Sequence, residues 1–346
     1  IHRGSSATLD AIASEELRVL PLTTSKNIGV LFFDSVTEAM AATVDILDLK
    51  PAAIEHIDRV LFDQTRGQLA FARARALLEL DAQPCEAILI VEFYDDDGGR
   101  LETLLQRKLG TRRAAFTDND DMEQIWSLRK AGLSLLTGCK GSAKPTAGIE
   151  DVAVTPERLP AYVEALQPAM ARLGLSGSFY GHAASGLLHV RPVVDLHRAE
   201  DIAKFRAIAD EVSAITKQFK GSIAAEHGIG IARTEYFADH VGPELLEAEK
   251  KIKALFDPKG LMNPGKLFDG ERFKIDTHLR QGANSDIALP FEPALAFRAK
   301  DESFIGNLEQ CNGSGACRKL TPSMCPTYIA IGEEISTERL KAGTER

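Results

Sequence analysis

The chain has 346 residues, a net charge of −9 and 44% hydrophobic residues. This length leaves room for two domains with a substantial core, and the acidic balance argues against nucleic-acid binding, because neutralising phosphates requires a basic face. No apolar run is long enough to span a bilayer and the first residues lack a signal-peptide core, so we expect a soluble, cytoplasmic protein, with a peripheral position at the inner membrane as the alternative.

Strands and helices are predicted to alternate over roughly the first two thirds of the chain. Hydrophobic alternation predicts strands at 27–33, 87–93, 113–117 and 149–154, and on both sides of Gly186. Helical spacing predicts helices at 36–48, 101–109, 119–136, 156–173 and 198–220. This pattern favours an α+β fold in which helices pack on one side of an antiparallel, ferredoxin-like sheet. The periodicity fades after Phe256, and residues 271–300 are predicted to form an irregular arm.

Two histidines lie near the middle of the chain on either side of a run of small residues. His182 and His189 differ by seven positions, so on one unbroken strand their rings would point to opposite faces. A turn over Ala184–Gly186 would fold the segment into a hairpin and direct both rings at one ion. The alternative is a structural hairpin whose histidines are only hydrogen-bonded.

A carboxylate and a third histidine follow in the segment Ala225–Gly230. Glu226 can supply an oxygen ligand to the same ion as His182 and His189. Because Glu226 and His227 are neighbours, we expect their side chains to diverge, which would leave His227 facing a substrate. Imidazole is the side chain best suited to proton transfer near neutral pH.

An ordered set of segments resembles the C-terminal half of the FAD-linked oxidases of the vanillyl-alcohol oxidase superfamily, which includes D-lactate and D-2-hydroxyglutarate dehydrogenases. The start of the chain, Gly4–Leu9 and 17–21, is similar to the end of that family's flavin-binding domain. The other segments in family order are Trp126–Arg129, Lys144–Pro145, Gly181–His189, Ala225–Gly230 and Phe256–Lys266.

The resemblance implies oxidation of a small D-2-hydroxy acid, of the lactate or 2-hydroxyglutarate type, by hydride transfer to FAD. The roles it implies are substrate-carboxylate binding by Arg129 and Lys144, general base by His227, and ligation of a divalent zinc or manganese ion by His182, His189 and Glu226. Two departures stand out: Leu187 replaces an Asn of the family pattern, and Ser6-Ala7 replaces Glu-Gly.

The resemblance also implies that most flavin contacts belong to an N-terminal domain preceding residue 1. The contacts expected within this chain are Gly4, Ser5, Thr8 and Asn263. We therefore expect the chain alone to lack tightly bound FAD and to be inactive.

Three of the five cysteines gather near the end of the chain, at Cys311, Cys317 and Cys325. They resemble a ferredoxin-type loop for a [4Fe-4S] cluster, with Ser314 where a middle cysteine would be. Such a cluster would pass electrons from the flavin to an acceptor protein or a quinone. A zinc site or three free thiols is the alternative.

The predicted organisation is a flavin-domain remnant at 1–22, a cap and substrate domain at 23–270, a linker arm at 271–300 and the start of an iron-sulfur segment at 301–346. An oligomer is compatible with the sequence. Two other functions remain open: a non-catalytic electron-transfer or docking module, and a metallohydrolase that uses the same histidines.

Overall fold

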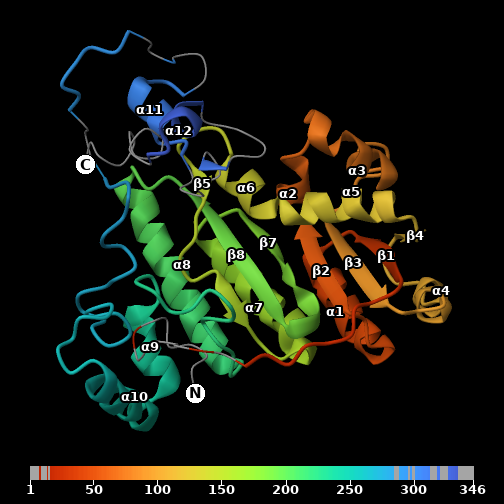
Figure 1. Ribbon diagram of the computed structural model, residues 1–346, viewed down its shortest axis with the longest axis horizontal. Coiled ribbons are helices and arrows are strands. Elements are labelled where there is room, and N and C mark those ends of the chain that lie inside the picture. The colour runs from red at the N-terminus through yellow and green to blue at the C-terminus, as the bar shows by residue number, and fades with distance from the viewer. Residues whose placement is uncertain are drawn as a thin grey trace.

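An eight-stranded antiparallel sheet forms the centre of the computed structural model (Figure 1). The structure describes residues 8, 14, 16–283, 288–294, 297, 301–311, 318–319 and 326–333. The strands are β1 Lys26–Phe33, β2 Ala53–Asp58, β3 Ala87–Tyr94, β4 Arg112–Phe116, β5 Lys144–Pro145, β6 Asp151–Ala153, β7 Gly177–His182 and β8 Leu187–Val194. Their order is β4-β1-β3-β2-β7-β8-β5, with β6 paired to β8.

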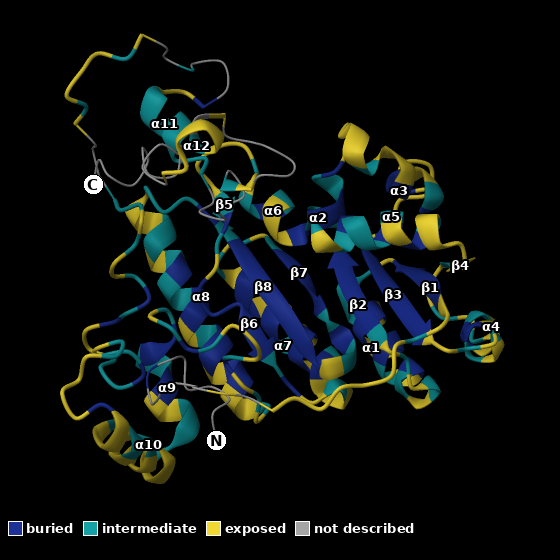
Figure 2. Cartoon of the chain, in the orientation of Figure 1, coloured by how far each residue is buried: buried dark blue, intermediate teal, exposed yellow. Residues whose placement is uncertain are grey.

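Two separate cores cover the two faces of the sheet. The helices packed on the first face are α1 Val36–Ile46, α4 Gly99–Gln106, α7 Leu159–Arg172 and α8 Ala199–Gln218. The helices packed on the second face are α2 Arg59–Asp63, α3 Ala72–Leu77, α5 Asn119–Lys130 and α6 Gly132–Thr137. Strands β1, β2, β3, β7 and β8 are almost entirely buried, whereas the edge strand β4 is only partly buried (Figure 2).

The α+β class with an antiparallel sheet is confirmed, and the structure adds the second helical layer to the one that the sequence predicted. This second layer packs on β4, β1, β3 and β2, and Tyr180 is the one described residue of β7 in its core. No residue of β8 belongs to its core. Polar side chains of β7 and β8 can therefore occupy this face, and the candidate site lies there.

The predicted helix at 119–136 is instead two helices. Asp118 accepts a hydrogen bond from the Asp121 backbone N–H and begins α5, which ends at Lys130. A new helix, α6, starts at Gly132. A side chain at Gly132 would come within 2.9 Å of Leu61 on α2, so the absence of a Cβ lets α6 pack closely against α2.

The remaining helices lie toward the C-terminus. They are α9 Thr234–Val241, α10 Pro243–Phe256, α11 Phe304–Leu308 and α12 Pro326–Ile331. Residues 271–283 form turns and bends, as expected for an irregular arm. Within the described ranges, no helix is both long and apolar enough to cross a membrane.

Candidate active site

The predicted hairpin between the two histidines is present. β7 and β8 pair antiparallel, and Tyr180 lies directly opposite His189. Directly opposed residues share a face, and so do residues two apart on one strand, which puts His182 and His189 on the same side of the sheet. Their ring centroids are 6.3 Å apart. Gly186 closes the turn with φ 73°, where a Cβ would lie 1.8 Å from the Val154 carbonyl oxygen.

Asp151, at the start of β6, shapes the loop that carries the third histidine. Its Oδ2 accepts the backbone N–H groups of Ala225, Glu226 and His227 at 2.8, 3.0 and 2.8 Å. Three successive N–H groups converge on one oxygen only when the backbone is bent. Glu226 and His227 therefore do not diverge as the sequence predicted, since an extended backbone would be needed for that.

The three imidazoles converge on Glu226. The Nε2 atoms of His182, His189 and His227 lie 3.5, 3.2 and 3.5 Å from its carboxylate oxygens. The side chains of Glu226 and His182 are 41% and 42% exposed, whereas that of His189 is 4% exposed. The cluster is therefore buried on the side of His189 and open on the side of Glu226 and His182, where a small molecule can reach it.

Each imidazole also has a buried carboxylate at its other nitrogen. Nδ1 of His182 is 2.6 Å from Glu55, Nδ1 of His189 is 3.8 Å from Asp151, and Nδ1 of His227 is 3.4 Å from Glu150. Sequence reasoning identified none of these three acids. The signal available was the pair Glu150-Asp151 inside the predicted strand at 149–154, where charged residues are out of place without a partner.

The surroundings shift the pKa values of the three histidines in different directions. The hydrogen bond to Glu55 raises the pKa of His182, and the hydrogen bond to Glu150 raises the pKa of His227. Burial, together with the charge of nearby His227, lowers the pKa of His189 to about 4. His189 is therefore neutral near pH 7, as a metal-binding imidazole must be.

The donor set fits a divalent cation. One ligand atom from each of Asp151, His189, Glu226 and His227 can be chosen so that all lie within 4.8 Å of one another. Within this group, Oδ1 of Asp151 and Nδ1 of His189 are buried without a hydrogen-bond partner. Mixed imidazole and carboxylate donors suit zinc or manganese. His182, which the sequence named as a ligand, lies outside this group of four but within 3.5 Å of Glu226.

Arg129, in the last turn of α5, lies beside the histidines. Its Nε and Nη2 atoms both bind Oε2 of Glu55 at 2.8 Å, and its guanidinium carbon is 5.5 Å from the centre of the Tyr180 ring. Glu55 thus links Arg129 to His182. A guanidinium has further N–H donors that this carboxylate leaves available to a substrate.

Lys144 is not brought to the histidines. It pairs with Val194 on β8, whereas Asp151 pairs with His189 on the same strand, and five residues of strand span about 16 Å. The Lys144 ammonium donates to the Cys139 carbonyl and to Oε1 of Gln310.

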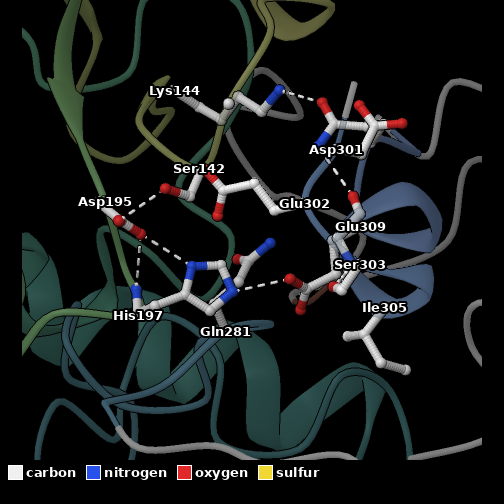
Figure 3. A pocket seen from close by; sticks show the side chains of 13 residues that line it. Ser142, Lys144, Asp195, His197, Gln281, Asp301, Glu302, Ser303, Ile305 and Glu309 are labelled. Atoms are coloured by element: carbon white, nitrogen blue, oxygen red, sulfur yellow. Dashed lines mark hydrogen bonds and ion pairs between the residues drawn. The ribbon is translucent and has the colours of Figure 1, made fainter. Parts of the chain in front are cut away.

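Lys144 instead lines a cavity of about 520 Å³ at the contact with α11. In this cavity His197 bridges Asp195 and Glu309, at 2.8 Å to each (Figure 3). These contacts join the end of β8 to the segment that leads to Cys311.

The predicted flavin and cluster residues are described only in part. Thr8 is fully buried, and Asn263 has φ 43° and accepts a hydrogen bond from Lys266. Cys311 is a half-buried free thiol. The predicted positions Gly4, Ser5, Cys317 and Cys325 lie outside the described residues.

Comparison with known proteins identifies the family. Residues 22–267 match the family described as FAD linked oxidases, C-terminal domain. The chain belongs to this family.

Curated relatives of this FAD-linked oxidase chain include D-2-hydroxyglutarate dehydrogenases. The enzyme of Pantoea ananatis is 30% identical over an alignment that covers 99% of this chain and 34% of the enzyme. The enzyme of Escherichia coli is 28% identical over an alignment that covers 99% of this chain and 35% of the enzyme. The glycolate oxidase subunit GlcD of Bacillus subtilis is 25% identical over an alignment that covers 77% of this chain and 56% of GlcD. The chain thus spans about a third of the length of the first two relatives.

Solved structures agree on the fold. p-Cresol methylhydroxylase has a TM-score of 0.52 at 12% identity, over 72% of this chain and 53% of its own. The 4-ethylphenol oxidase of Gulosibacter chungangensis has a TM-score of 0.50 at 13% identity, over 72% and 54%.

Proposed function

We propose that this chain forms the substrate side of an FAD-dependent dehydrogenase that oxidises a D-2-hydroxy acid of the 2-hydroxyglutarate or lactate type. The observation that carries the proposal is the convergence of three Nε2 atoms on Glu226, with a buried carboxylate at each Nδ1. Family membership and the named relatives support this reaction class. When bound, FAD supplies the acceptor for the hydride that leaves the hydroxyl-bearing carbon.

His182, His189 and Glu226 are proposed to hold a divalent ion, zinc or manganese. When bound, the ion polarises the substrate hydroxyl and lowers its pKa. His182 can offer Nε2 because Glu55 favours a proton on its Nδ1, and Nε2 of His189 lies 3.2 Å from Glu226. Glu226 adds the negative charge that stabilises the cation.

His227 is proposed as the general base. A carboxylate can only accept a hydrogen bond, so Glu150 fixes the His227 proton on Nδ1 and leaves Nε2 free to take the hydroxyl proton. The charge of Glu150 then stabilises the imidazolium that forms. Burial opposes ionisation of Glu150, but His227 and Arg233 hold its pKa at about 2, so it stays charged.

Arg129 and Lys144 are proposed to bind substrate carboxylate. Arg129 can do so with the guanidinium N–H groups that Glu55 leaves unused. For Lys144 the role requires that its ammonium exchange the Cys139 carbonyl and Gln310 for the substrate. The flavin contacts proposed within this chain are Gly4, Ser5, Thr8 and Asn263.

We further propose that electrons pass to an iron-sulfur centre ligated by Cys311, Cys317 and Cys325, and then to a protein or quinone acceptor in the cytoplasm. The D-2-hydroxyglutarate dehydrogenases align with 99% of this chain, which includes residues beyond the family match at 22–267. This alignment includes the cysteine-bearing segment, and what supports the proposal is the spacing of the three cysteines.

The substitution His227→Ala tests the proposal. The variant should reduce bound flavin about 10²- to 10⁴-fold more slowly with D-2-hydroxyglutarate or D-lactate, because the base is lost. Anaerobic stopped-flow absorbance of the chain reconstituted with its flavin-binding domain and FAD measures this rate. His278→Ala, at an exposed histidine of the irregular arm, is the matched control and should leave the rate unchanged. Undiminished flavin reduction in His227→Ala would contradict the assigned base.

A further inference from the structure

Glu55 occupies an unusual position for an acid. It lies in the middle of β2, directly opposite His182 on β7, and only 6% of its surface is exposed. A buried carboxylate is strongly disfavoured unless its charge is paired and its oxygens accept hydrogen bonds. Both oxygens of Glu55 do so.

The two oxygens of Glu55 serve two different functional groups. Oε1 lies 2.6 Å from Nδ1 of His182, while Oε2 accepts from Nε and Nη2 of Arg129 at 2.8 Å. These partners come from different layers of the fold, since His182 is the last residue of strand β7 and Arg129 lies in the last turn of helix α5. One carboxylate therefore sets the position of both.

We propose that Glu55 is a positioning residue that holds the metal-binding imidazole of His182 and the substrate-binding guanidinium of Arg129 in a single arrangement. This inference rests on the proposed function of those two residues. At His182, Glu55 keeps the proton on Nδ1 and directs the Nε2 lone pair toward Glu226. At Arg129, it holds the nearer nitrogens and orients the remaining donors.

The neighbouring strand offers a matched control. Glu92 on β3 is also 6% exposed, and its Oε1 accepts a hydrogen bond from Trp126 on the same helix α5, at 3.2 Å. Among the described residues, neither His182 nor Arg129 is a hydrogen-bond partner of Glu92, in contrast to Glu55. Replacing Glu92 by Gln thus removes a buried charge of the same sheet without touching the proposed link.

The experiment compares Glu55→Gln with Glu92→Gln in the purified protein that carries the flavin-binding domain and FAD. Titration calorimetry with Mn²⁺ or Zn²⁺ gives the metal dissociation constant, and steady-state kinetics with D-2-hydroxyglutarate and D-lactate give KM and kcat. Glu55→Gln should weaken metal binding about 10- to 100-fold, the usual effect of losing a carboxylate behind a ligating histidine. It should also raise KM about tenfold through Arg129. Glu92→Gln should change neither constant.

A Glu55→Gln variant with unchanged metal affinity, or with unchanged KM, would overturn the proposed link. A wild-type protein that binds no divalent ion would contradict the proposed function itself and the inference with it. If Glu55→Gln does not fold, a measurement on the wild type still tests the role of Glu55. Nitrogen-15 NMR of the metal-loaded protein should show the His182 proton on Nδ1, and a proton on Nε2 instead would overturn the proposal.

Discussion

The histidines of this chain differ in their hydrogen-bond partners, and the difference determines in which direction the pKa of each is shifted. His182 and His227 have carboxylates within 2.6 and 3.4 Å of Nδ1. His56, next to Glu55 on β2, is fully buried, and neither of its ring nitrogens has a hydrogen-bond partner among the described residues. Burial and the nearby charge of Arg129 lower the pKa of His56 to about 3, so it stays neutral in the folded protein.

This depressed pKa predicts that His56 destabilises the fold in acid. Between pH 6.5 and 3 the unfolded chain binds a proton at His56, whereas the folded chain does not. The free energy of unfolding contributed by His56 therefore falls as the pH falls. From pH 7.5 to pH 5.0 the loss is about 2 kcal/mol. Urea unfolding of wild type and His56→Leu at both pH values measures it.

The comparison with His56→Leu isolates this effect from that of Asp58. Burial raises the pKa of Asp58 to about 7, and this contribution has the opposite sign, because the folded state then holds a proton that the unfolded state releases as the pH rises toward 7. The Asp58 contribution cancels between the two proteins. Equal losses of stability on acidification in wild type and His56→Leu would disprove the assignment.

At the scale of single elements, the sequence predicted the β7–β8 hairpin because its signals are local. His182, His189 and the small residues between them determine the turn within one short segment. Strand β2 was missed because Glu55, His56 and Asp58 interrupt its apolar pattern, and these polar groups are explained only by partners on β7 and α5. The divergence of Glu226 and His227 was wrongly predicted because Asp151, which bends their backbone, is distant in sequence.

The turn of this hairpin depends on Gly186. Gly186→Ala would force an alanine into a left-handed φ of 73°. It would also place a Cβ only 1.8 Å from the Val154 carbonyl oxygen. Gly67 has nearly the same φ, 75°, but nothing lies within 4 Å of its Cβ position. Gly67→Ala should therefore cost only about 1–2 kcal/mol of unfolding free energy, the penalty of the backbone conformation alone.

Gly186→Ala should cost more than about 3 kcal/mol, because the backbone carbonyl must also move. Chemical denaturation of both variants measures the difference. Equal losses would mean that the approach of Val154 to the turn is not close in solution.

At the scale of the whole molecule, the two helical layers determine where the chemistry lies. Among the described residues, the core of the first layer extends to β8, whereas the core of the second layer packs on β4, β1, β3 and β2 and includes Tyr180 of β7. The histidines lie on the second face just beyond this layer, and Arg129 and Glu55 connect them to its edge. The sequence predicted the antiparallel class and singled out His182, His189, Glu226 and His227, but not Asp151. It could not predict the second layer, because short helices such as α2 and α3 carry too few residues to show a period.

The central claim is that His182, His189 and Glu226 hold a divalent ion beside the base His227. Crystals of the protein loaded with Mn²⁺ or Zn²⁺, measured at the absorption edge of the metal, test it most directly. We predict one anomalous peak at about 2.0–2.2 Å from Nε2 of both histidines and from a Glu226 oxygen. His227 should lie outside the ligand set, with Nε2 turned toward the substrate position. The absence of a peak there, or a peak ligated by Asp151 and His227 instead, would contradict the account.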